Sequence, residues 1–237
     1  MRNAELHIDE LEKFFGNKES FRVEELHSFY MEYNNLVPIS TVYWRINSLV
    51  KRGVIQRIGR GTYKLGSDNT FQPEMHMKLF KINSFMSSNF PYLKYCIWSI
   101  EEINLLAQHL INKRKIYIDV ERDVVESVFE QLHDRFKNIF KGQSNDNVVS
   151  NEYIIVVRPL VTGSPTQVIR GVTTITIEKL LVDLFCDKEF DFLQGYELTH
   201  IFNNAFSKYT INVDKLLRYA SRKEKRTVLE EFLKTIN

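Results

Sequence analysis

Two carboxylates near the middle of the chain have the types and the spacing of metal ligands. Asp119 and Glu121 lie in the run YIDVER, where a strand pattern ends and a helical pattern begins. Carboxylates at a strand end could hold the divalent cation of a nuclease-like core, which activates water and stabilises developing charge. The same acids also suit the ordinary start of a helix, because acidic side chains interact favourably with its N-terminal dipole. The sequence alone leaves both interpretations open.

The sequence carries few other signs of catalysis. It has no phosphate loop, no GxGxxG, no HExxH and no CxxC, and its six histidines show no ligand spacing. Gly163 and Ser164 resemble the start of a nucleotidyltransferase signature, but no aspartate pair follows in a strand, so we expect a turn there. Cys96 and Cys186 are far apart and are expected to be small core residues. We therefore expect no cofactor, and we expect no metal because a strand end followed by a helix start accounts for Asp119 and Glu121 as well.

A stretch without any acidic residue carries the clearest chemical signal. Residues 33–67 contain six Lys or Arg and no Asp or Glu, which gives +6, whereas residues 1–32 contain four basic and eight acidic residues. The rest of the chain is neutral, with 22 of each kind. Such a concentrated positive charge is typical of a surface that faces a polyanion. The alternative is a solvated basic face that binds no partner.

Helical periodicity predicts three helices before this basic stretch ends. The first covers residues 4–15, and the second covers the run FRVEELHSFYMEY after a possible cap at Ser20. The third covers VYWRINSLVKRG, with Ser40 or Thr41 as its cap and Gly53 as its end. Helices of this length and order are typical of a helix-turn-helix.

Two short strand patterns follow the third helix. They cover residues 54–58 and Thr62–Leu65, and the turn GRG between them places Arg60 at the tip of a hairpin. A helix-turn-helix with such a basic two-stranded wing is a winged helix, which we expect over residues 1–66.

The third helix has one apolar face and one polar face. Val42, Ile46, Leu49 and Val50 share the apolar side at 100° per residue. Short hydrogen-bonding side chains mixed with Arg and Lys, as on the other side, suit base edges and phosphates. Trp44 could instead contact a protein or the second domain, because Trp is enriched at interfaces. The predicted DNA-binding residues are Ser40, Thr41, Trp44, Arg45, Asn47, Ser48, Lys51 and Arg52 in the helix, and Arg57, Arg60 and Lys64 in the wing.

A larger second domain is expected over residues 71–237, after the polar linker GSDN. Strand and helix patterns alternate in it, which predicts an α/β domain (α+β for the chain overall) with a mixed or parallel sheet. The run VIRGVTTITI is expected to be an edge strand or a hairpin. The predicted strands are YCIWS, IYIDV and YIIVVRP, the predicted loop is KGQSNDN, and the predicted helices are residues 73–87, 100–110 and 122–140, then EKLLVDLFC, 196–206, 213–220 and 223–236 as a C-terminal helical cluster.

The start of the chain does not have the pattern of a secretory signal. The run MRNAELHIDELEKFF has acidic residues where a signal peptide needs an apolar segment, and no later run approaches the ~20 apolar residues of a membrane span. We expect a cytoplasmic protein that does not contact a membrane.

The basic stretch also resembles a known family. The run SLVKRGVIQRIGRGTYKL is similar to the end of the N-terminal winged helix of the AbiEi family, antitoxins of type IV abortive-infection toxin–antitoxin systems. The matching residues are Arg52 and Gly53, the strand at 55–58, Arg60 with Gly61, and Tyr63. The later runs IWS and TITIEKLLVDLF resemble the C-terminal domain of that family, so the similarity extends over most of the chain.

The resemblance implies a specific function. Such a protein would be a DNA-binding antitoxin that represses its own operon through inverted repeats, and it would counter a nucleotidyltransferase-like toxin without necessarily forming a stable complex. It implies no catalysis. A second contact surface, for the toxin or for RNA, is predicted at a basic cluster near the C-terminus that could otherwise be a solvated helix face. This cluster comprises Arg218, Arg222, Lys223, Lys225 and Arg226.

Two other classes of protein compete with this hypothesis. A nuclease targeted to DNA by its winged helix would need more carboxylates clustered around Asp119. A winged-helix adaptor that binds only protein would not need an acid-free basic surface.

Overall fold

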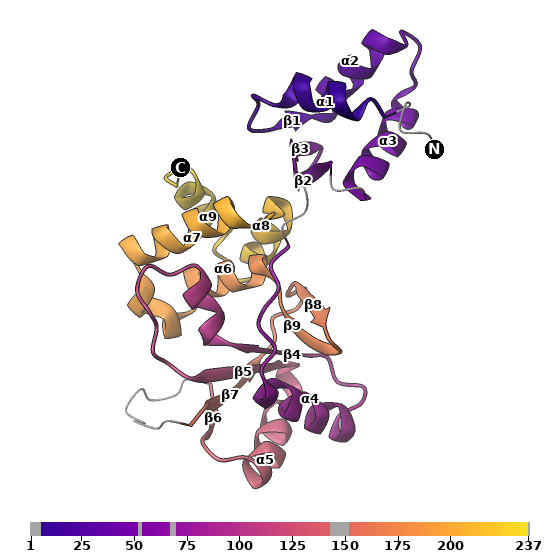
Figure 1. Ribbon diagram of the computed structural model, residues 1–237. Coiled ribbons are helices and arrows are strands. Elements are labelled where there is room, and N and C mark those ends of the chain that lie inside the picture. Colours follow the sequence, from indigo (N-terminus) through magenta and orange to yellow (C-terminus); the bar gives the residue numbers. More distant parts are fainter. Residues whose placement is uncertain (1–5, 52–53, 67–69, 143–151, 237) are drawn as a thin grey trace. The chain divides into compact units, whose positions relative to one another are not determined.

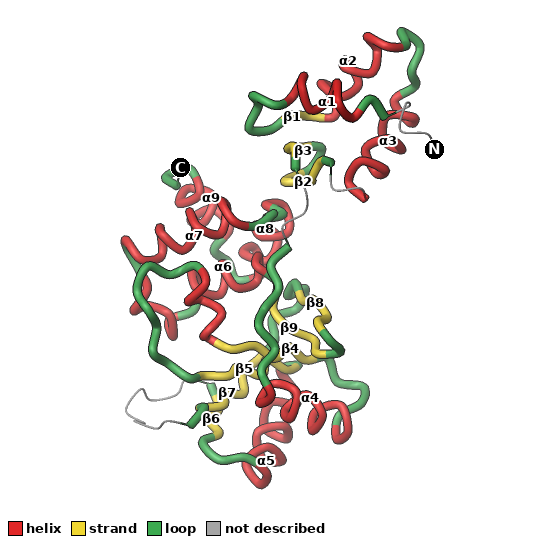
Figure 2. The backbone as a smooth tube through the Cα atoms, viewed as in Figure 1, coloured by secondary structure: helices red, strands yellow, loops and turns green. Residues whose placement is uncertain are grey.

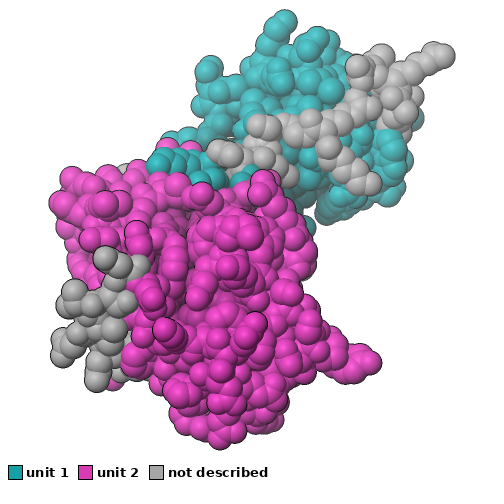
Figure 3. All heavy atoms as spheres, turned by 60° about the horizontal axis from the view of Figure 1, so that its bottom comes forward, with its two compact units in different colours: residues 1–70, 208–214 teal, residues 71–207, 215–237 magenta. Residues whose placement is uncertain are grey.

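The computed structural model describes residues 6–51, 54–66, 70–142 and 152–236 (Figure 1). The chain forms two compact units, which Figure 3 distinguishes by colour. Unit 1 comprises Met1–Thr70 with Lys208–Asp214, and unit 2 comprises Phe71–Ser207 with Lys215–Asn237. The fold is mixed α/β, with several small sheets and a C-terminal helical cluster (Figure 2).

The described residues of unit 1 form three helices and one small antiparallel sheet. Its aromatic core includes Phe15, Phe21 and Phe29, and the rings of Phe15 and Phe21 lie 4.0 Å apart. The strands are ordered β1-β3-β2, so β3 lies in the middle. The elements are α1 (Ile8–Phe15), β1 (Phe21–Arg22), α2 (Val23–Tyr33), α3 (Ile39–Lys51), β2 (Ile55–Gly59) and β3 (Thr62–Leu65).

Both helix starts that had been predicted from caps are wrong. Phe21 pairs with Tyr63 of β3, so α2 begins only at Val23, and a Glu25 carboxylate accepts the Arg22 N–H at 2.8 Å in place of a Ser20 cap. The third helix begins directly after Pro38, whose carbonyl accepts the first backbone hydrogen bonds of the helix. Ser40 and Thr41 therefore lie inside α3. The helix predicted over 4–15 is also too long, because Leu6 and His7 form a turn and α1 begins at Ile8. Residues 4 and 5 and the predicted end at Gly53 lie outside the described residues.

Unit 2 is built around a four-stranded mixed sheet of order β4-β5-β7-β6. β7 is parallel to β5 and to β6, whereas β4 is antiparallel to β5, which confirms the predicted mixed sheet. In Figure 1, α4 and α5 cover one face of the sheet, and α6 and α7 lie on the other side. The elements are β4 (Tyr95–Ser99), β5 (Lys115–Val120), β6 (Ile139–Lys141), β7 (Ile154–Pro159), α4 (Met77–Asn89), α5 (Val125–Arg135), α6 (Ile177–Cys186) and α7 (Tyr196–Lys208).

The two faces of this sheet differ in chemistry. Ile118, Ile155 and Val157 belong to the apolar core with α4 and α5. Neighbouring residues of the same strands point to the opposite face, because side chains alternate along a strand. That face carries the register partners Asp119 and Arg158. The sheet therefore places two charged residues side by side on the face toward α6.

The remaining elements complete unit 2 and lead into the C-terminal cluster. Arg170 and Gly171 both have positive φ, 49° and 80°, and form the tight turn of a hairpin over VIRGVTTITI, which confirms that prediction. The elements are β8 (Thr166–Ile169), β9 (Val172–Ile175), the 3₁₀ helices η2 (Ile100–Leu105), η3 (Arg122–Val124) and η4 (Lys188–Leu193), and the helices α8 (Val213–Arg222) and α9 (Arg226–Leu233).

Several predicted helix ranges in this half are wrong. The helix predicted over 100–110 is only the 3₁₀ helix η2, and the following loop is closed by the Asn104 side chain, which accepts the Ile111 N–H at 2.7 Å. The helix predicted over 122–140 ends at Arg135, because Ile139 pairs with Ile155 of β7. Tertiary pairing thus overrides local helical periodicity.

Other predicted ranges differ from the structure at their ends. The helix predicted from residue 73 begins at Met77, and the last helix begins at Arg226 after a turn in which Glu224 has φ 59°. The run KGQSNDN begins in β6 and otherwise lies almost wholly outside the described residues. Within the part of the chain that the structure describes, no helix combines the length and the apolar character of a membrane span.

Candidate functional site

The solvent face of α3 collects several of the predicted DNA-binding residues. Ser40, Trp44 and Asn47 are exposed, and the Trp44 side chain is 45% accessible. Tyr43, which sequence reasoning missed, is 51% exposed and lies one turn before Asn47. Its i, i+4 spacing from Asn47 is the signal that could have identified it. The predicted residues Thr41, Arg45 and Ser48 are half-buried at the edges of this face.

Arg45 does not point fully toward solvent. Its guanidinium lies 4.4 Å from the centroid of the Tyr30 ring, and the Tyr30 hydroxyl donates to the carbonyl of Leu6 at 2.9 Å. This cation–π contact draws Arg45 toward α2. Arg52 and the side chain of Lys51, both predicted to contact DNA, lie outside the described residues.

The wing residues do not share one face of the hairpin. Arg57 pairs with Tyr63, whereas Gln56 pairs with Lys64, so strand alternation puts Arg57 and Lys64 on opposite faces. Arg57 is exposed and its Nε donates to the Gly59 carbonyl at 3.0 Å. Arg60 is exposed at the turn, and Lys64 is half-buried. Arg57 and Arg60 are thus the exposed cations of the hairpin, and Lys64 lies on the face opposite to Arg57.

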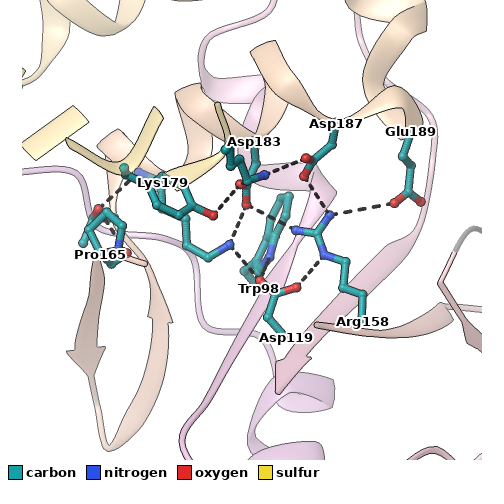
Figure 4. Close-up of polar contacts among 11 residues, drawn as sticks. Trp98, Asp119, Arg158, Pro165, Lys179, Asp183, Asp187 and Glu189 are labelled. Carbon is teal, nitrogen blue, oxygen red and sulfur yellow. Dashed lines mark hydrogen bonds and ion pairs between the residues drawn. The ribbon is translucent and has the colours of Figure 1, made fainter. Parts of the chain in front are cut away.

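In unit 2, Asp119 lies at the centre of a buried network of ion pairs (Figure 4). Its Oδ1 is 2.5 Å from Arg158 Nε, and its Oδ2 is 2.8 Å from Lys179 Nζ. The Trp98 indole N–H donates to the same Oδ2 at 3.2 Å. Strands β4, β5 and β7 and helix α6 each supply one of these residues, so the network joins the sheet to the helical cluster.

Asp183 extends the network toward α8. It lies 2.5 Å from Lys179 Nζ and 2.5 Å from Lys223 Nζ, and it accepts the Tyr219 hydroxyl at 2.8 Å. Lys223 also lies 2.6 Å from Asp187. The first of these contacts is an i, i+4 pair within α6, and the others connect α6 to the end of α8. We call Asp119, Arg158, Lys179, Asp183, Asp187 and Lys223 the ion network.

Nearby cations keep two of the buried carboxyl groups of this network ionised. Burial opposes the charged form of Asp119, but Arg158 and Lys179 outweigh it and hold the pKa of Asp119 below its usual value. Lys179 and Lys223 likewise lower the pKa of Asp183 against its burial. The pKa of Asp187 is raised, because burial and the nearby Asp183 together outweigh its two cations.

The network bears on the metal-ligand interpretation of Asp119 and Glu121. Asp119 is 1% exposed and two cations already occupy both of its oxygens. Glu121, by contrast, is exposed. No group of three or more His, Cys, Asp or Glu within the described ranges is placed to hold a metal ion. The geometry therefore favours a structural role for Asp119.

The predicted basic cluster near the C-terminus is divided. Lys223 belongs to the ion network, and Arg226 forms an ion pair with Glu230 at 2.8 Å. Arg218, Arg222 and Lys225 are exposed. These five residues therefore do not form one solvated face.

Sequence reasoning missed most of the ion network. Arg158, Lys179, Asp183 and Asp187 were not singled out, although the first two interrupt apolar runs. The usable signal was the i, i+4 spacing of Lys179 and Asp183 within EKLLVDLF, a helix whose other positions are mostly apolar. A helix that is apolar on nearly all sides is buried, so its charges need buried partners.

One known family matches a range of the chain that includes both the α3 face and the ion network. A family described as "Family of unknown function (DUF6577)" matches residues 41–237, which include most of α3, the β2–β3 hairpin and the whole ion network. The chain belongs to the DUF6577 family. No curated protein matches the sequence.

This DUF6577 protein also buries a carboxyl outside the ion network. Glu102 is 3% exposed, and its oxygens accept the backbone N–H of Glu74 at 3.0 and 3.1 Å. Burial, with smaller contributions from the nearby Glu74 and Glu101, raises the pKa of Glu102 to about 8. The folded state therefore binds a proton that the unfolded chain releases near its ordinary pKa of 4.5.

Glu102→Gln should make the stability of the protein less dependent on pH. A raised pKa stabilises the fold at low pH, and this contribution is lost as pH rises from 4.5 toward 8, by about 1.4 kcal/mol per pH unit. The neutral amide can still accept the Glu74 N–H. We expect the variant to match the parent at pH 5 and to exceed its denaturation midpoint at pH 8. Glu130→Gln, an exposed control on α5, should follow the parent at both values, and identical curves for all three would contradict the assignment.

Proposed function

We propose that this protein binds double-stranded DNA through unit 1, with α3 as the recognition helix and β2 and β3 as a basic wing. The observation that carries the proposal is the exposed α3 face with Ser40, Trp44 and Asn47, within a stretch that contains no acidic residue. A duplex presents base edges to the amide and hydroxyl groups, and phosphates to the arginines.

The order of the elements in unit 1 supports this proposal. Its elements follow one another in the order α1, β1, α2, α3, β2 and β3, which is the order expected of a winged helix, and the sheet order is β1-β3-β2. In a helix-turn-helix, the second helix of the motif lies in the major groove. In this chain that helix is α3, whose apolar side packs in the core through Val42, Ile46 and Leu49.

We further propose that the protein is a cytoplasmic transcriptional autorepressor and antitoxin of a type IV abortive-infection system. This part rests on the resemblance to the AbiEi family. The operator would contain inverted repeats, and the toxin would be a nucleotidyltransferase-like protein that is countered functionally rather than by an obligatory complex. The engagement of Asp119 by Arg158 and Lys179 supports this non-catalytic function over a nuclease.

DNA binding is tested with the full chain and duplex from its own promoter region. We expect saturable binding by fluorescence anisotropy, tighter than to a scrambled duplex and weakened steeply by salt, because each phosphate contact releases counterions. Absence of binding at 50 mM salt would contradict the proposal. Antitoxicity is tested separately, by co-expression with the nucleotidyltransferase-like toxin, where continued growth is the expected result.

Asn47→Ala should reduce discrimination between sequences more than it reduces binding as such. An amide that pairs bidentately with adenine contributes about 1–3 kcal/mol of discrimination, which corresponds to a roughly five- to 150-fold smaller ratio of Kd values on scrambled and selected duplexes. Asn17→Ala, an exposed control in the turn after α1, should keep the parent ratio. An unchanged ratio in the Asn47 variant would exclude α3 as the base-reading element.

Trp44 separates the DNA-binding hypothesis from the protein adaptor. If the exposed ring lies in the major groove, Trp44→Ala should weaken specific DNA binding as well. If it serves only a protein partner, the anisotropy titration of this variant should overlay that of the parent.

A further inference from the structure

A pocket with a volume of about 470 Å³ opens over the ion network of unit 2. Asp119 near the end of β5, Pro159 at the end of β7, and Gly142 directly after β6 all line it. These are the carboxyl ends of three parallel neighbours, the place where open α/β sheets usually bind ligands. Its volume lies within the usual range for small-molecule sites.

The floor of this pocket is already charge-paired. Arg158, Lys179 and Lys223 each contact at least two carboxylates, at distances between 2.5 and 3.9 Å. Glu189, at one side, lies 3.6 Å from Lys115 and 3.9 Å from Arg158. A ligand therefore meets a floor in which no carboxylate is left without a cation.

The rim of the pocket is different, because its exposed cations are not paired. Arg222 and Lys188 both line the pocket, and within the described ranges neither side chain forms a hydrogen bond or an ion pair. Arg222 ends α8 and lies against the turn that contains Gly163, where an added Cβ would be 3.8 Å from the Arg222 Nε. Glu121 and Asp123 line an adjoining hollow that Arg222 also borders, and neither is an ion-pair partner of Arg222.

We propose that this pocket binds a small phosphate-bearing ligand, with Arg222 and Lys188 at the rim and Lys223 at the floor. Arginine presents a rigid fork of donors that matches phosphate oxygens, and lysine adds a compact charge. A neutral floor and a cationic rim favour an anion over a cation. The concave shape and limited volume favour a small molecule over a nucleic-acid strand. The proposal does not depend on DNA binding by unit 1.

The test is isothermal titration calorimetry of the full chain with pyrophosphate, adenosine 5′-monophosphate and adenosine. We expect both phosphate compounds to bind and adenosine not to bind. Arg222→Gln and Lys188→Gln should each weaken binding at least about tenfold, because a hydrogen bond to a charged group is lost. Arg218→Gln is the matched control, since Arg218 is exposed one turn earlier on α8 and does not line the pocket.

The outcomes separate the proposal from its alternatives. Failure of the parent protein to bind either phosphate compound would overturn it. Equal affinity of the parent and both rim variants would also overturn it, because the ligand would then not contact Arg222 or Lys188. Equal weakening in the Arg218 control would indicate an unspecific charge effect and would also overturn the proposal. Lys188→Gln provides an independent result if Arg222→Gln lowers the melting temperature.

Discussion

Asp119→Ala is expected to lower the free energy of unfolding of unit 2 by about 3–5 kcal/mol, the usual cost of removing one partner of a buried ion pair. All three side chains of this contact are buried: Asp119 is 1% exposed, and its partners Arg158 and Lys179 are 11% and 2% exposed. Without the carboxylate, both cations stay buried with fewer anions, and the Trp98 indole N–H loses its acceptor. Asp119→Asn should also be destabilising. It keeps the shape of the side chain, so its effect isolates the loss of the negative charge.

Urea denaturation followed by Trp98 fluorescence would measure this change. The chain has two tryptophans, so a Trp44→Phe background confines the signal to unit 2. Glu126→Ala is the control, because Glu126 and its partner Lys141 are 61% and 46% exposed, and an exposed pair contributes less than about 1 kcal/mol. A loss below 1 kcal/mol for both Asp119 variants would show that the ion network contributes little to folding.

The ion network also predicts how unit 2 responds to acid. The pKa values of Asp119 and Asp183 are lowered in the fold, so their stabilisation is present above the ordinary pKa of 3.8 and is lost as pH falls through the folded values. Glu102 acts in the opposite direction, because its pKa is raised. Stability should therefore be greatest at mildly acidic pH.

The parts of the fold that could be predicted are those fixed by local pattern. Helix α3 has a clear apolar face, α6 is apolar at most positions, and the β8–β9 hairpin has a turn whose residues permit positive φ. The parts that could not be predicted depend on distant partners. Strand β6 follows a helical pattern in sequence, and only pairing of Ile139 with Ile155 makes it extended.

The same distinction applies to the candidate sites. The α3 face was predictable because every member lies within one helix and shares one periodicity. The ion network was not, because Asp119, Arg158, Asp183 and Lys223 come from β5, β7, α6 and the turn after α8, and sequence spacing does not report their proximity. Arg45 shows the limit within a helix, since the position of the Tyr30 ring decides where its guanidinium lies.

The double change Arg57→Gln and Arg60→Gln is expected to have the largest effect on DNA binding. Both side chains are exposed on the wing, and each phosphate contact contributes about 0.9 to the slope of log K against log salt. The variant should therefore lose up to about 1.8 units of slope on specific and scrambled duplexes alike. Its binding at low salt should be weaker for both duplexes, because phosphate contacts carry no sequence information.

Lys64→Gln provides a control of the same charge type in the same hairpin. Lys64 pairs with Gln56, so its side chain lies on the opposite face from Arg57, and we expect its change to leave the slope within about half a unit of the parent. Anisotropy titrations between 50 and 200 mM salt measure all three proteins. Lys64→Gln removes one charge and the double variant removes two. If Lys64→Gln lowers the slope by half as much as the double variant does, the wing attracts DNA only through net charge. If neither variant changes the slope, the wing does not contact phosphate, and the proposed docking of unit 1 is wrong.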